Sequence, residues 1–223
     1  MLHFDIITIF PEIFNSYFKE SLLQKAQKKR LLKINIHNLR KWAKDRHQTV
    51  DDKPFGGGRG MVMKIEPIDR ALKSLKKSLP ASRQGKTKVI LFSPRGRKFN
   101  QKMATQWSKL NHLIFICGRY EAVDERVAEH LADEVVSIGD YVLMGGELPA
   151  MIVIETIARL ITGVVGKSEL LKKERITKEK GFLEYPQYTR PEVFRKWPVP
   201  KVLLSGHHQK IEGWRAKHSK VIE

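Results

Sequence analysis

The chain has 223 residues, which corresponds to one full domain and an appendage at about 150 residues per domain. Hydrophobic residues make up 41% of it and charged residues 30%, a balance that excludes an intrinsically disordered chain. The 42 lysines and arginines outnumber the 24 carboxylates by 18, and this excess favours a polyanionic partner, with nucleic acid as the first candidate.

The first third of the chain alternates between strand and helix patterns. Residues 2–10 are apolar and β-branched and predict a buried strand, and Pro11 suits the first position of a helix that runs to about residue 29. Alternating residues at 32–36 predict a half-buried strand. A loop rich in Asp, Gly and Pro follows at 46–60, and a helix is predicted at 67–79.

The same alternation continues to residue 163. The predicted elements are a strand at 88–92, a helix at 100–110, a strand at 113–116, a helix at 124–131 and a strand at 134–138. We expect Asn100 to cap its helix. The segment 148–161 is apolar on most sides, so it predicts a buried helix with Gly163 as its stop. Strands alternating with helices favour an α/β domain with a mainly parallel sheet.

The character of the sequence changes after Gly166. Residues 167–180 hold six basic and three acidic residues with little apolar pattern, and we interpret them as an interdomain linker or lid. The tail at 181–223 is rich in proline, ends in a predicted helix at 209–217, and is too short for a large core of its own. We therefore expect a catalytic domain at 1–166, the lid, and a small C-terminal segment that binds RNA.

Nothing in the sequence points to a membrane or to an oxidising compartment. The longest apolar runs, such as residues 89–92, fall far short of the 20 or so residues that span a bilayer. The first residues lack a basic region followed by an apolar stretch, and a single cysteine, Cys117, cannot form an internal disulfide. We expect a cytoplasmic protein with no membrane partner.

One glycine-rich loop could hold phosphate. Gly56, Gly57, Gly58, Arg59 and Gly60 place bare backbone N–H groups beside a guanidinium. A plain flexible loop explains the same residues equally well.

Three further loops follow predicted strands, at 93–97, 118–121 and 138–149. Ligands of open α/β sheets bind at the carboxyl ends of the strands, so these loops predict one small-molecule pocket. None of them is a dinucleotide fingerprint, and the pattern by itself predicts no reaction.

Taken in order, these segments resemble the bacterial tRNA (guanine-N1)-methyltransferase family, TrmD, of the SPOUT methyltransferase class. The resemblance rests on residues 9–12, 46–52, 56–61, 118–121, 137–149, 188–191 and 203–206. It implies transfer of a methyl group from S-adenosyl-L-methionine to N1 of guanosine 37, next to the anticodon of tRNA. It also implies an α/β fold with a deep trefoil knot, a homodimer whose subunits share each active site, and an activity associated with Mg²⁺.

The resemblance also assigns residues. The implied cofactor-binding residues are Phe92, Ser93, Pro94, Gly118, Arg119, Tyr120, Glu121, Ile138, Gly139, Asp140, Tyr141, Val142, Leu143, Gly145, Gly146 and Pro149. The implied RNA-binding residues are Arg46, His47, Asp51, Gly58, Arg59 and Gly60.

The chemistry needs two further groups. N1 of neutral guanine carries a proton, so a general base must remove it, and a cation should stabilise the charge that develops on O6. By resemblance the base is Glu174 in the lid, where the family normally has Asp, and the cation is Arg159. The longer side chain of Glu changes its reach, and Glu169 and Glu179 are alternatives as the base.

Other departures are smaller. Arg59 stands where the family usually has Pro and should add a phosphate contact, and Met144 and Leu170 stand where Ser is usual. The C-terminal helical domain of the family normally continues past the position of Glu223, so we expect a short, truncated helical tail. An RNA-binding protein that has lost catalysis, and a SPOUT methyltransferase acting on another RNA site, stay open as alternatives.

Overall fold

The computed structural model describes residues 1–78, 86–165, 181–183 and 185–222. They belong to two compact units, Met1–Gly166 and Lys167–Glu223. The first unit is built on a five-stranded sheet in which every neighbouring pair is parallel. In spatial order its strands are β2 (Leu32–Asn38), β1 (Leu2–Thr8), β6 (His112–Cys117), β5 (Thr87–Lys98) and β8 (Glu134–Ser137). The expected α/β class with a mainly parallel sheet is confirmed, whereas the trefoil knot stays a prediction.

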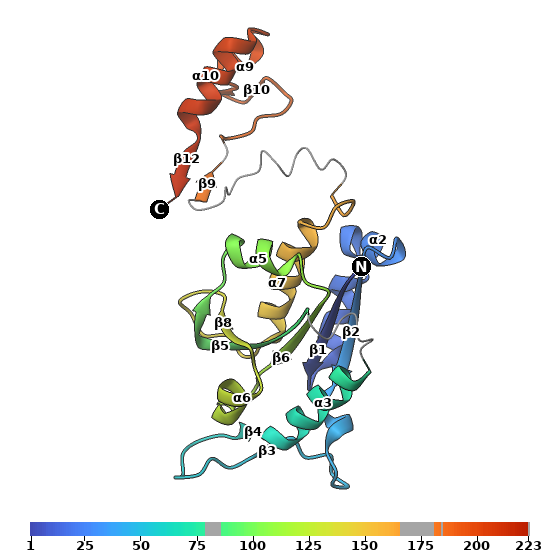
Figure 1. The fold of residues 1–223 in the computed structure, drawn as a ribbon. Coiled ribbons are helices and arrows are strands. Elements are labelled where there is room, and N and C mark those ends of the chain that lie inside the picture. The colour runs from blue at the N-terminus through green and yellow to red at the C-terminus, as the bar shows by residue number, and fades with distance from the viewer. Residues whose placement is uncertain (79–85, 166–180, 184, 223) are drawn as a thin grey trace. The chain divides into compact units, whose positions relative to one another are not determined.

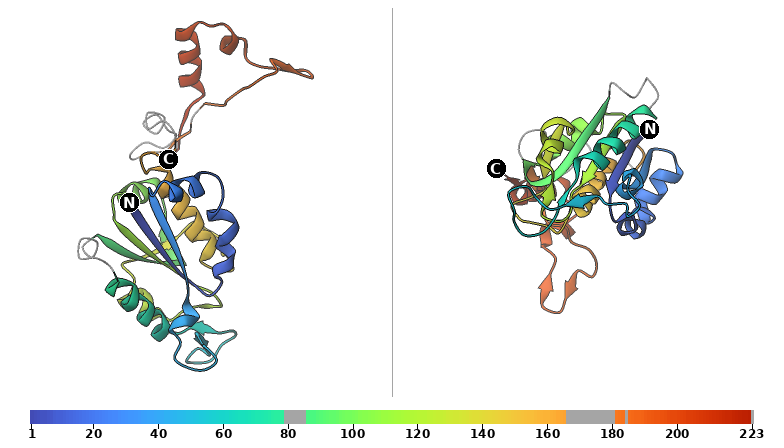
Figure 2. Two further views of the ribbon diagram at one scale, coloured as in Figure 1. Left: turned by 90° about the vertical axis from the view of Figure 1, so that its right-hand side faces the viewer. Right: turned by 90° about the horizontal axis from the view of Figure 1, so that it is seen from below.

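Helices cover both faces of this sheet (Figures 1 and 2). They include α3 (Ile65–Lys77), α5 (Gln101–Trp107), α6 (Glu125–His130) and α7 (Glu147–Arg159). On β1, Phe4 and Ile6 join the apolar cluster that includes α5 and α7, and Ile7 joins the opposite cluster with α3 and α6. Both layers exclude water, and β1 is therefore buried at all seven positions.

The segment after β1 differs from its prediction. The first strand ends at Thr8 instead of residue 10, because the Thr8 hydroxyl accepts a hydrogen bond from the Phe10 N–H (3.0 Å) and closes a turn. The single helix expected at 11–29 is broken into η1 (Pro11–Phe14), α1 (Asn15–Phe18) and α2 (Ser21–Lys28). The break falls at Lys19 and Glu20: Glu20 is extended (φ −120°, ψ 159°), and Ser21, where α2 begins, has a left-handed φ of 50° that cannot continue the preceding right-handed helix.

Strand β5 also runs further than its apolar core predicts. Phe92 and Arg97 both pair with Val136 of β8, so the four residues between them loop out of the sheet. Gly96 is required at the return, since a Cβ there would lie 2.4 Å from the Val136 nitrogen. The excursion places Ser93 and Pro94 at the carboxyl end of the buried half of the strand.

Several predicted elements have the expected bounds and caps. Asn100 caps α5 by accepting a hydrogen bond from the Met103 N–H, and α7 occupies most of the predicted buried helix at 148–161. Short elements were not foreseen: η2 (Leu39–Trp42) and a small sheet of β3 (Asp51–Asp52), β4 (Val62–Met63) and β7 (Ala122–Val123).

The second unit is small, as its sequence suggests. Its elements are β9 (Gly181–Leu183) paired with β12 (Lys220–Ile222), a hairpin of β10 (Val193–Phe194) and β11 (Trp197–Pro198), and the helices α9 (Lys201–Leu204) and α10 (His208–His218). Helix α10 matches the predicted final helix. None of the side chains at 185–219 is buried, and the contacts gather on Trp214, which stacks on His218 at 4.1 Å.

Across the described parts of both units, no helix combines the length and apolar character needed to cross a bilayer.

Candidate active site

A cavity of about 600 Å³ lies in the first unit at the carboxyl ends of β5, β6 and β8. Three loops form it: the excursion after Phe92, the turn after Cys117, and the long connection from β8 to α7. This is where the sequence predicts a pocket, because parallel strands bring all three loops to the same edge of the sheet.

Most of the predicted cofactor-binding residues lie together in this cavity. Those that line it are Phe92, Ser93, Pro94, Gly118, Arg119, Tyr120, Glu121, Ile138, Tyr141, Val142, Leu143, Gly145, Gly146 and Pro149. Gly139 and Asp140 are not among its lining residues. Asp140 pairs with Lys98 on the surface, and Gly139 lies under the Tyr141 ring, where a Cβ would approach the ring to 2.3 Å.

The backbone of two loops approaches closely at Gly146. A Cβ on Gly146 would lie 2.7 Å from the Cys117 Cα and 3.0 Å from the Gly118 nitrogen. The Gly146 N–H also donates a hydrogen bond to the Gly118 carbonyl at 2.9 Å. Since these neighbours are backbone atoms at the end of β6, they cannot move aside, and only glycine fits here.

A buried carboxylate that we did not predict ties the walls of the pocket together. Glu147, the first residue of α7, is 1% exposed. It accepts hydrogen bonds from the Thr8 hydroxyl at 2.7 Å and from Arg119 Nε at 2.8 Å. The Arg119 guanidinium also lies 4.8 Å from the centre of the Phe10 ring and contacts the Met144 carbonyl. Arg119 thereby joins the turn after β6 to the β8–α7 connection and to the segment after β1.

Cys117 plays no chemical part in this pocket. Burial raises the pKa of its thiol well above the ordinary value, and the negative charge of Glu147 raises it further. The thiol therefore stays protonated and packs as a small apolar group, as expected from its place at the end of an apolar strand.

The glycine-rich loop adjoins the pocket through the small sheet. β4 pairs with β3 on one side and with β7 on the other, and the Glu121 N–H donates to the Met61 carbonyl at 3.1 Å. Gly60 lies against the pocket residue Glu121, where a Cβ would meet its Cγ at 2.4 Å.

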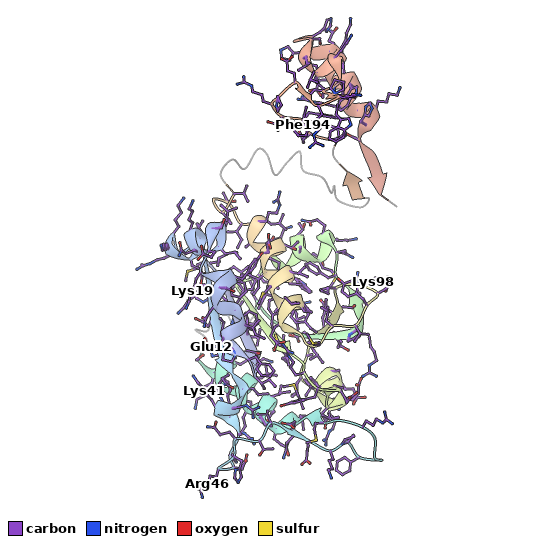
Figure 3. The ribbon with its side chains drawn as sticks, turned by 180° about the vertical axis from the view of Figure 1, so that it is seen from behind. Glu12, Lys19, Lys41, Arg46, Lys98 and Phe194 are labelled. Carbon is purple, nitrogen blue, oxygen red and sulfur yellow. The ribbon has the colours of Figure 1, made fainter. Side chains whose placement is uncertain are left out.

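The predicted RNA-binding residues all lie in or beside this loop. Gly58, Arg59 and Gly60 are exposed between β3 and β4, and Asp51 is half-buried on β3. Arg46 and His47 are exposed in the turn before β3, where Figure 3 shows Arg46 at the surface.

That turn is ordered by one carboxylate. Asp45 accepts hydrogen bonds from the side chain and the backbone of Thr49, which lower the pKa of Asp45. It therefore stays ionised at neutral pH and holds the exposed turn closed.

Only one of the two predicted catalytic residues belongs to the part of the chain that the structure describes. Arg159 is the exposed last residue of α7. Glu174, with the alternatives Glu169 and Glu179, lies outside the described residues. Among the residues that are described, no group of three His, Cys, Asp or Glu side chains is arranged to hold a metal ion, so Mg²⁺ stays an expectation.

Sequence reasoning missed Glu147 and Thr8 as parts of the site. Glu147 lies inside the segment 137–149, yet a lone acid at the start of a helix is also typical of an exposed N-terminal turn. Thr8 gives no signal at all within an apolar strand. Arg95 and Met144 also line the cavity and belong to the loops that we singled out.

Comparison with known proteins identifies the family. The family model described as "tRNA (Guanine-1)-methyltransferase TrmD" matches residues 2–222. A tRNA (guanine-N(1)-)-methyltransferase of Dictyoglomus turgidum is 52% identical over 219 residues, which cover 98% of this chain and 85% of the relative. Proteins of the same name from Carboxydothermus hydrogenoformans (50% identical; 96% and 81% covered) and Ruminiclostridium cellulolyticum (49%; 98% and 91%) are similarly close.

Proposed function

Because the chain belongs to the tRNA (guanine-1)-methyltransferase TrmD family, we propose that it transfers a methyl group from S-adenosylmethionine to N1 of guanosine 37 of tRNA. One observation carries the proposal: the family match spans residues 2–222, and so includes the three loops that line the pocket. Since tRNA and the methyl donor meet in the cytoplasm, we propose that the enzyme works there.

The pocket has the features that an adenosyl ligand requires. Its volume lies within the range of sites for small molecules. Val136, Ile138 and Leu143 offer apolar walls to a flat base, and Gly118 and Gly146 let the backbones of two loops meet at the wall of the pocket. Bound there, S-adenosylmethionine would supply an electrophilic methyl group on a sulfonium, so the protein has only to orient it and the acceptor.

The acceptor requires a base and a cation. We propose that Glu174 removes the proton from guanine N1 and that Arg159 stabilises the negative charge that develops on O6. Tyr141 lines the pocket and is 55% exposed, and we propose that it contacts the target base.

The length of α7 bears on where Arg159 acts. The helix begins at the pocket and Arg159 is twelve residues after Glu147, so the two lie about 18 Å apart along its axis at 1.5 Å per residue. No arginine side chain spans that distance. The guanidinium therefore cannot reach the pocket of its own subunit, and we propose that it serves the pocket of a second copy.

The exposed side of α7 is suited to such a second copy. Leu148, Ile152, Glu155 and Arg159 recur at helical spacing on the side of α7 that is not buried. Leu148 and Ile152 are 55% and 44% exposed, although both are large and apolar. The Tyr17 hydroxyl donates to Glu155, which brings α1, with Phe10 and Ile13 just before it, beside this face. We propose a homodimer that buries this apolar face and places Arg159 across the two-fold axis.

The decisive experiment follows the methyl group. The purified protein is incubated with tritium-labelled S-adenosylmethionine and tRNA transcripts that carry G or A at position 37, and the RNA is digested to nucleosides. We expect labelled 1-methylguanosine from the G37 transcript and no label in the A37 transcript. Label in another nucleoside would assign a different RNA site, and binding of tRNA without transfer would assign a non-catalytic RNA-binding protein.

A further inference from the structure

The β10–β11 hairpin of the second unit carries two aromatic side chains without cover from the rest of that unit. Phe194 and Trp197 face each other across the hairpin with their ring centres 6.0 Å apart, and they are 54% and 66% exposed. All residues from 191 to 198 are exposed. Within its unit the hairpin extends away from α10 (Figure 2), and Figure 3 shows Phe194 at the surface.

The turn of this hairpin holds a cation over the aromatic pair. The Arg195 guanidinium lies 5.4 Å from the centre of the Phe194 ring and 5.9 Å from that of Trp197. Arg195 has a φ of 57°, a left-handed conformation that two-residue hairpin turns normally give to glycine or asparagine. A strained arginine at such a place, stacked on exposed rings, is the kind of feature that is found at binding sites.

Charge indicates the chemistry of the partner. Arg190, Arg195 and Lys196 lie in or beside the hairpin against one carboxylate, Glu192. The segment 181–223 as a whole has eight lysines and arginines against four acids. Aromatic rings beside arginine occur at protein interfaces as well, so the excess of cations is the deciding feature. Exposed rings with a surplus of positive charge match the bases and phosphates of a single strand.

We propose that the β10–β11 hairpin is a stacking contact for unpaired nucleotides of the tRNA substrate, with Phe194 and Trp197 stacking on bases and Lys196 near the phosphates. The choice of tRNA as the ligand rests on the proposed function. The hairpin itself belongs to the second unit, and the methyl-donor pocket belongs to the first. An isolated two-stranded hairpin is marginally stable in water, and stacked bases would also stabilise it.

Binding of tRNA to the full chain tests the proposal directly. The dissociation constant of a tRNA transcript is measured by fluorescence anisotropy for the wild type and for Trp197→Ala, Trp197→Phe and Leu204→Ala. Leu204 is the matched control, because it is a large apolar side chain of the same unit that is 48% exposed. We expect Trp197→Ala to weaken binding about 5- to 150-fold. Trp197→Phe should retain most of the affinity and Leu204→Ala all of it.

Arg195→Gly separates a binding role from a structural one. Glycine adopts the observed φ without strain, so this variant should keep or raise the melting temperature while it weakens tRNA binding. In the methylation assay, the Trp197→Ala defect should appear in KM for tRNA and leave kcat and the affinity for S-adenosylmethionine unchanged. The defect should also vanish on a fully paired RNA duplex, which offers no bases for stacking.

Unchanged tRNA affinity in Trp197→Ala would overturn the proposal. If Trp197→Ala also lost the proposed dimer in sedimentation while it kept its tRNA affinity, the hairpin would be assigned to a protein contact instead. Because the binding assay needs no catalysis, failure of methyl transfer would leave this test valid, and the two failures can be told apart.

Discussion

Replacement of Glu147 by alanine should weaken the fold and the pocket together. The carboxylate is buried and accepts hydrogen bonds from Thr8, which is fully buried, and from Arg119. Removing one partner of a buried ion pair costs about 3–5 kcal/mol, because the other charge is left without compensation. The Arg119 side chain keeps 19% exposure to water, so we expect the lower end of that range, about 3 kcal/mol.

Two assays measure this loss. At about 2–4 °C per kcal/mol for a chain of this size, the melting temperature should fall by about 6–12 °C. Calorimetry should show weaker binding of S-adenosylmethionine, because Arg119 no longer holds the turn after β6 against Met144. Glu147→Gln keeps one acceptor oxygen, so its melting temperature and its affinity for S-adenosylmethionine should fall less than those of Glu147→Ala. Glu129→Ala, an exposed acid on α6, is the control and should shift neither quantity. A Glu147→Ala protein with wild-type melting and affinity would refute the role of this contact.

Three further predictions concern pH, assembly and the shared site. Burial by itself raises the pKa of Asp5, but hydrogen bonds from His112, His37 and Asn35 outweigh it and lower that pKa well below the ordinary value. The contribution of Asp5 to the free energy of unfolding is therefore complete above the unfolded-state pKa of about 3.9 and is lost as the pH falls below that value. Below about pH 3.9, the urea midpoint of Asp5→Asn should change less with pH than that of the wild type. Ile152→Glu should convert the proposed dimer to monomers in sedimentation, and a dimer that persists in this variant would count against the α7 face. A heterodimer of one Arg159→Ala chain and one Gly146→Ala chain, purified by two tags, has one site in which an intact pocket meets an intact Arg159 from the other chain. It should retain about half of the wild-type activity, whereas each variant homodimer should be inactive. An inactive heterodimer would contradict a site built from two chains.

The parts of the fold that short-range patterns encode could be predicted from the sequence. Apolar runs located the five strands of the sheet, and the side chain of Asn100 marked the start of α5. The pocket followed from glycine-bearing loops after parallel strands. All of these features depend on residues close together in the chain.

The features that could not be predicted depend on distant partners or on single backbone angles. Thr8 and Glu147 are 139 residues apart and meet only when α7 packs beside β1. The return of β5 at Gly96 depends on contact with β8, and the helix break depends on the left-handed Ser21. Apolar spacing carries no information on any of these.

The central claim is that the pocket between the three loops holds the methyl donor, and calorimetric titration with S-adenosylmethionine tests it most directly. Gly146→Ala places a methyl group against the backbone of Cys117 and Gly118, whereas Gly213→Ala adds the same group in open space on α10. We predict that the wild type and Gly213→Ala bind the donor with equal affinity and that Gly146→Ala does not bind it. Undiminished binding by Gly146→Ala would contradict the assignment of the pocket.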